Sequence, residues 1–132
     1  MTIDTDAQPG PQGIGPVGPG IVLVDPVSSA DVSQVAQVWR NAGWRVVHMS
    51  GGADLEAVLA GFGRVLSFPS RYGRNLDALR DCLADMRTDT AVLWSGWQPF
   101  QCDSPRDWGR LVDTIGQCLD EDKLDGFALL LV

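Results

Sequence analysis

The chain has 132 residues, a formal net charge of −7, and 45% hydrophobic residues. A chain of this length fits one domain with its own core, and its apolar runs are far shorter than the ~20 residues of a membrane span. The excess of acidic residues argues against direct nucleic-acid binding and favours a basic protein partner.

The start of the chain and the cysteines narrow the class further. Acidic residues and a Pro/Gly tract follow Met1, in place of a basic start and an apolar leader, which predicts a cytoplasmic protein. Cys82, Cys102 and Cys118 are odd in number and form no CxxC pair, so neither a disulfide framework nor a zinc site is expected. We expect no metal and no cofactor, and a monomer in the free state.

The chain is predicted to alternate strands and helices after a disordered Pro/Gly-rich tail at 1–20. Apolar runs predict strands at 21–24, 44–49, 91–94 and 127–132, and helical spacing predicts helices at 28–42, 55–66, 75–86 and 104–119. Ser28, Asn75 and Ser104 are the expected N-caps. Residues 21–132 should therefore form a layered α/β domain, a parallel sheet of about four strands covered by about four helices.

Three enzymatic interpretations find little support. His48 is the only histidine and lies in an apolar strand without a recognisable partner, which favours a packed or rim histidine. The pair Gly51-Gly52 lacks the lysine and hydroxyl of a phosphate-binding loop and is better explained as a tight turn. The third strand leads into residues 94–97 without an acid, so a magnesium-dependent receiver-like site is not expected. The sequence predicts a protein that is not an enzyme.

The helix predicted at 75–86 carries an unusual acidic row. Asp77, Asp81 and Asp85 recur at i, i+4 and i+8, which places them on one face. The apolar residues opposite are predicted to face the core: Leu76, Leu79, Leu83 and Met86. Like charges at this spacing destabilise a helix, and the helix dipole favours only the first of the three. The row is either an ordinary charged surface, with Arg74 and Arg80 pairing with Asp77 and Asp81, or a surface kept for a partner.

Residues 68–83 resemble the signature loop and helix of the barstar family of ribonuclease inhibitors. They read Phe-Pro-Ser-Arg-Tyr-Gly-Arg-Asn-Leu-Asp-Ala-Leu-Arg-Asp-Cys-Leu. The resemblance covers about Trp44 to Val132, so residues 21–43 should add a strand and a helix to a family core of three strands. It implies a barstar-like fold and a protein that blocks the active site of a secreted microbial, guanyl-specific ribonuclease in a 1:1 complex.

The resemblance also implies which residues contact the partner. The carboxylate of Asp81 is similar to the one that fills the substrate-phosphate pocket of the nuclease, and Asp77 would be a second anion. Tyr72, Gly73 and Asn75 are implied to shape the loop. The other expected contact residues are Arg71, Arg80, Ala84 and Asp85.

Two departures from the family pattern affect the choice of partner. Arg71 and Arg80 stand where the family carries aromatic contact residues, and they would weaken binding to a strongly basic nuclease or pair with carboxylates of a less basic one. They also keep open a second hypothesis, a barstar-like interaction module whose partner is not a ribonuclease. The acidic run 120–122 is either a further contact or a solvent-exposed helix end.

Overall fold

A computed structural model of the protein describes residues 18–24, 29–69, 72–121, 124 and 126–132. Its elements, in chain order, are β1 (Gly20–Leu23), α1 (Ser29–Asn41), β2 (Arg45–Ser50), α2 (Leu55–Val65), α3 (Leu76–Ala84), β3 (Thr90–Ser95), α4 (Gln98–Asp103), α5 (Pro105–Asp120) and β4 (Phe127–Leu131). The four strands and four of these helices lie where the sequence predicts them. Most of the expected tail, residues 1–17, and the expected cap Ser28 fall outside the described residues.

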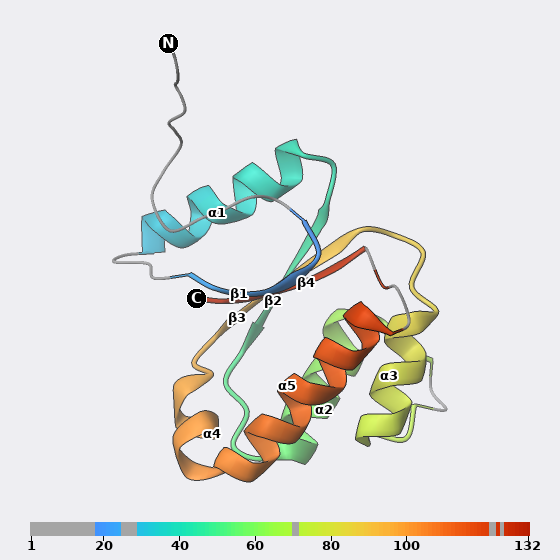
Figure 1. Ribbon diagram of the computed structural model, residues 1–132. Coiled ribbons are helices and arrows are strands. Elements are labelled where there is room, and N and C mark those ends of the chain that lie inside the picture. The colour runs from blue at the N-terminus through green and yellow to red at the C-terminus, as the bar shows by residue number, and fades with distance from the viewer. Residues whose placement is uncertain (1–17, 25–28, 70–71, 122–123, 125) are drawn as a thin grey trace.

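The four strands form one parallel sheet in the order β1-β4-β3-β2. Its register aligns Val47, Val92, Leu129 and Ile21 in one row across the sheet. Figure 1 shows α1 alone on one face and the other helices on the opposite face. The predicted parallel α/β architecture is confirmed, and both faces of the sheet are covered, as parallel sheets require.

The larger core lies between the sheet and the helices α2, α3 and α5. Phe62, Leu79, Leu83, Leu111 and Ile115 are fully buried there. They come from the apolar faces that helical spacing predicts, so the inward orientation of each helix follows from its sequence. For α3, this burial turns the opposite, acidic face outward.

The smaller core lies between the sheet and α1. Val35, Ala36 and Trp39 pack with Leu93 and Leu130 on this face of the sheet. Trp39 is completely buried. The N-terminal unit therefore covers a face that residues 44–132 alone would leave open. Its strand, β1, lies at the sheet edge beside β4.

The segment between β3 and α5 contains a helix, although no element was predicted there from the sequence. It turns at Gly96, whose φ is 70°, and then forms the short helix α4 with Pro99 in its first turn. Phe100 is fully buried against Trp108, which explains why this short turn is held in place. The N-cap prediction for α5 is right in position only, because Ser104 makes no side-chain capping hydrogen bond.

Candidate protein-binding site

Helix α3 is held firmly at its start and along its inner face. Leu79 and Leu83 have no exposed surface, and the side-chain oxygen of Asn75 accepts a hydrogen bond from the Ala78 N–H at 2.8 Å. The predicted cap is confirmed, and it satisfies one of the helix's free N–H groups. Side chains on the outer face of α3 therefore project from a fixed backbone.

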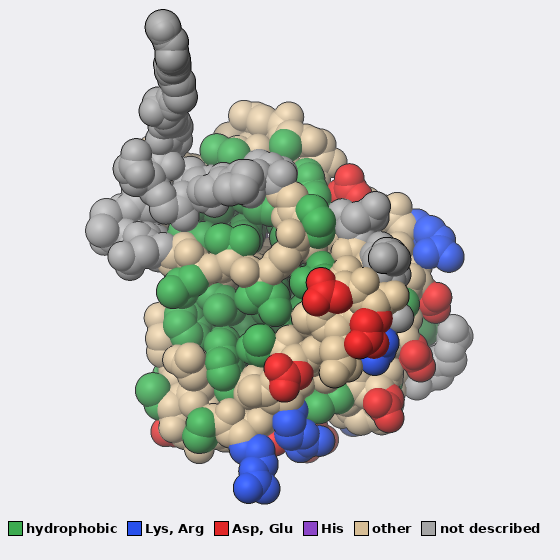
Figure 2. Space-filling view, in the orientation of Figure 1, with side chains coloured by type: hydrophobic (Ala, Val, Ile, Leu, Met, Phe, Trp, Pro, Cys, Tyr) green, Lys and Arg blue, Asp and Glu red, His purple; other side chains and the backbone are tan. Residues whose placement is uncertain are grey.

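The acidic row on that outer face is solvent-exposed. Asp77, Asp81 and Asp85 are all exposed, and none of their carboxylates has an ion-pair partner within the described part of the chain. Asp77 lies in the first turn, where the helix dipole favours an acid, but Asp85 is the C-cap, where the dipole disfavours one. Figure 2 shows acidic side chains gathered over α3 and the neighbouring part of α5.

The sequence left open whether Arg80 pairs with Asp81. In the structure, Arg80 contacts α5 instead. Its Nη2 lies 3.1 Å from Oε1 of Glu121, and its Nη1 donates to Oε1 of Gln117 at 3.2 Å. The arginine thus bridges α3 to α5, and its charge is compensated there. The aspartate row keeps its negative charge as a result. On α5, the polar residues Asp113, Gln117 and Glu121 also recur every four residues, a sequence signal for a polar face beside α3 that the prediction did not use.

A shallow hollow of about 450 Å³ separates the start of α3 from α5. Asp77 and Asn75 line it on one side, and Arg110, Asp113 and Thr114 line it on the other. The guanidinium of Arg110 lies 3.2 Å from a carboxylate oxygen of Asp107, its own neighbour along the helix. The acidic surface therefore continues from α3 onto α5.

The loop before α3 is anchored by Tyr72. Its hydroxyl donates to the Leu59 carbonyl at 3.0 Å, and its ring meets Phe68 edge to face, with centroids 5.0 Å apart. The ring lies so close to α2 that a Cβ at Gly63 would come within 2.8 Å of it. Burial raises the pKa of Tyr72 to about 12. Tyr72 therefore anchors the loop to α2.

Two of the other expected contact residues lie near the ends of α3, Gly73 just before its N-cap and Ala84 at its last position. Gly73 is exposed, and a Cβ there would approach the Asn75 amide nitrogen to 3.1 Å. Arg74 adopts a left-handed conformation with φ 52°. Ala84 is exposed at the last position of α3, and Arg71 lies outside the described residues.

The residues considered for catalysis do not come together. His48 is exposed on β2, one of the two edge strands of the sheet, and none of the described residues forms a cluster suited to a metal ion. Gly51 and Gly52 have positive φ and form the predicted turn, and the indole N–H of Trp94 donates to the Gly51 carbonyl at 2.8 Å. Among the helices of the described segments, none has the length and apolar character needed to cross a bilayer.

The fold and this surface define an α/β protein that carries an exposed, anionic helix. The chain belongs to the barstar family, because the family model "Barstar (barnase inhibitor)" matches residues 44–132. This family consists of ribonuclease inhibitors that are not enzymes, in agreement with the prediction from the sequence. Comparison with curated proteins gives no match. The matched region begins just before β2, so β1 and α1 are the predicted addition to the family core.

Proposed function

We propose that this protein inhibits a small guanyl-specific ribonuclease, of the kind that microbes secrete, by placing α3 and the preceding loop in its active site. The complex is 1:1 and forms in the cytoplasm of the producing cell, and the free inhibitor is a monomer that binds no nucleic acid. One observation carries the proposal: Asp77, Asp81 and Asp85 are exposed on a rigid helix without an ion-pair partner in the described chain.

The chemistry of the target explains why such a row is useful. Ribonucleases gather cationic side chains to stabilise the charge of the reacting phosphate. A carboxylate on a fixed helix can occupy that cationic pocket and accept charge-assisted hydrogen bonds in place of the phosphate. Asp81, in the middle of α3, is the residue for this pocket, and Asp77 is the second anion, one turn nearer the loop.

The ion pair between Arg80 and Glu121 indicates which charge the active site of the partner should carry. Because Glu121 neutralises this arginine, α3 presents its carboxylates with little local offset. An anionic surface of this kind accelerates encounter with a cationic active site. We therefore expect the nuclease to have a cationic active site, even though Arg80 replaces an aromatic contact residue of the family.

Calorimetric titration into a panel of small guanyl-specific ribonucleases, together with RNA-cleavage assays, tests the proposal. We expect 1:1 binding and loss of cleavage for at least one nuclease, and a loss of about 3 kcal/mol, or more than 100-fold in affinity, for Asp81→Ala. Asp103→Asn is the matched control, because this exposed acid ends α4, away from α3, and should bind like the parent.

Two outcomes would contradict the proposal. If no nuclease binds, the acidic row serves a partner of another kind, such as the non-ribonuclease partner of the second hypothesis. If a nuclease binds but Asp81→Ala binds equally well, α3 is not the inhibitory element.

A further inference from the structure

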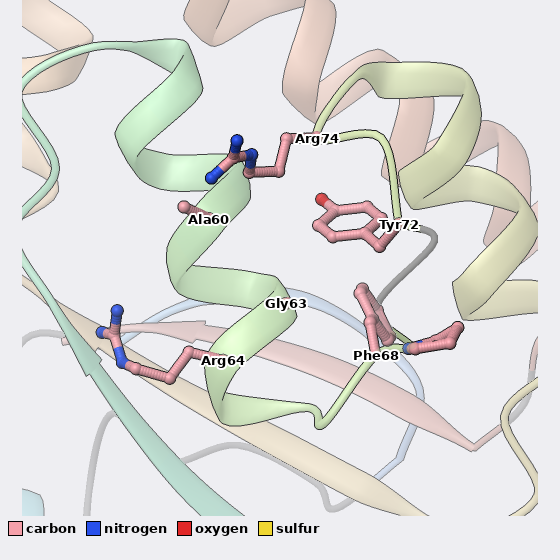
Figure 3. Close-up of a pocket in the computed structure, with 7 residues that line it drawn as sticks. Ala60, Gly63, Arg64, Phe68, Tyr72 and Arg74 are labelled. Atoms are coloured by element: carbon pink, nitrogen blue, oxygen red, sulfur yellow. The ribbon is translucent and has the colours of Figure 1, made fainter.

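A second hollow, of about 360 Å³, lies between α2 and the loop that leads into α3. Figure 3 shows how it is built. Phe68 and Tyr72 supply aromatic walls, Ala60 and Gly63 supply the surface of α2, and Pro69 and the two arginines Arg64 and Arg74 complete the lining. Because Gly63 has no side chain, the Tyr72 ring lies directly on the helix and fixes the shape of the hollow.

Arg64 and Arg74 both line this hollow, which is unusual in an acidic protein. Both arginines are exposed, and neither has an ion-pair partner in the described segments. The described lining of the hollow contains no carboxylate. Arg64 lies in the last turn of α2, where the helix dipole favours a cation. Arg74 has no such reason for its place: it holds a left-handed φ of 52°, which glycine or asparagine adopts more readily. The fold alone therefore does not explain this second cation.

We propose that this hollow binds a carboxylate side chain of the partner ribonuclease, an inference that rests on the proposed function. Arg74 stands three residues before Asp77, so the cationic hollow and the acidic row follow one another along the same loop and helix. The matching nuclease surface carries an acidic residue beside its cationic centre. Alternating charges of this kind favour one nuclease over others that are basic throughout.

The exposure of both arginines favours a carboxylate on the partner over a free anion. Contacts of exposed charges are weak in water, so a dissolved phosphate or acetate would occupy the hollow only at high concentration. A nuclease already bound at α3 presents its own carboxylate at a high effective concentration, and a weak contact then contributes to affinity and selectivity.

The test uses the full-length protein and the nuclease that binds it most tightly in the panel, with Arg64→Gln, Arg74→Gln and the double variant. We expect each single variant to bind about two- to fivefold more weakly, the double variant more weakly still, and the losses to shrink in high salt. Arg40→Gln is the matched control, because this exposed arginine lies in the last turn of α1, on the opposite face of the sheet. One acidic residue of the nuclease should then show coupling to Arg74 in a double-mutant cycle.

The sign of the effect separates the possible results. If the glutamine variants bind as tightly as the parent or more tightly while Asp81→Ala still loses affinity, the hollow receives no carboxylate and only this inference fails. If the parent binds no nuclease in the panel, the proposed function and this inference fail together.

Discussion

Asp81, which we propose to be the main contact with the nuclease, should lower the stability of the free protein. It stands one helical turn from both Asp77 and Asp85, and all three are exposed without an ion-pair partner among the described residues. Two like-charge pairs at this spacing cost about 0.2–0.5 kcal/mol each. Asp81→Asn, which removes the charge alone, should raise the free energy of unfolding by about 0.5–1 kcal/mol. Asp81→Ala adds the better helix propensity of alanine, about 0.6 kcal/mol, for a total of about 1–1.5 kcal/mol.

Urea unfolding at low and high salt separates the two contributions. In about 1 M salt the charges are screened over a few ångströms, so the gain of Asp81→Asn should disappear. Asp81→Ala should keep its propensity part of about 0.6 kcal/mol. If Asp81→Asn instead lowers the free energy of unfolding at low salt, the carboxylate stabilises the fold. The acidic row would then have a structural explanation, and its assignment to a partner would be refuted.

Three further predictions concern the cores, the loop and the bridge between helices. Trp39→Ala should lower the free energy of unfolding by about 3–5 kcal/mol, because it removes a fully buried side chain. Trp39→Phe should lower it by about 1 kcal/mol or less, because the buried indole N–H has no hydrogen-bond partner in the described structure. Urea unfolding of both variants checks this, and equal losses would contradict it. Burial raises the pKa of Tyr72, the only tyrosine, from 10.0 to about 12. The unfolded chain therefore loses the phenol proton first, and the free energy of unfolding should fall as the pH rises from about 10 to 12. Ultraviolet titration of the phenol measures its pKa directly, and a value near 10 would refute the prediction. In Tyr72→Phe, the free energy of unfolding should not show this fall between pH 10 and 12. A double-mutant cycle with Arg80→Met and Glu121→Gln should give a salt-sensitive coupling of about 0.5–1 kcal/mol, because both side chains are partly exposed, and no coupling would show that the bridge adds nothing to stability.

Local patterns were sufficient to predict most of the fold. Apolar runs predicted the strands because β3 and β4 are buried on both faces, and helical spacing predicted which face of α3 turns inward. The cap at Asn75 was predictable because capping depends on neighbours within three residues. Helix α4 was missed because its formation depends on the burial of Phe100 against Trp108, a tertiary contact.

For the candidate site, the sequence predicted which residues share an exposed face, but it did not predict which side chains they contact. Asp77, Asp81 and Asp85 share a face because of spacing alone, and the structure places them outward. The partner of Arg80 depends on α5 lying beside α3, so the arginine reaches Glu121, 41 positions along the chain. No local pattern specifies such a contact.

The position of β4 bears on the order in which the molecule folds. Strand β4 lies between β1 and β3, and Gly20 in β1 is paired with Ala128 in β4. Strand β1 leaves the ribosome early but has no neighbour in the sheet until residues 127–131 have been made. Contacts between segments so distant in sequence form slowly, because a long loop must close first. We therefore expect the N-terminal unit to dock late, after α2, α3 and α5 have packed on the other face, so that α3 is in place before the second face of the sheet is covered.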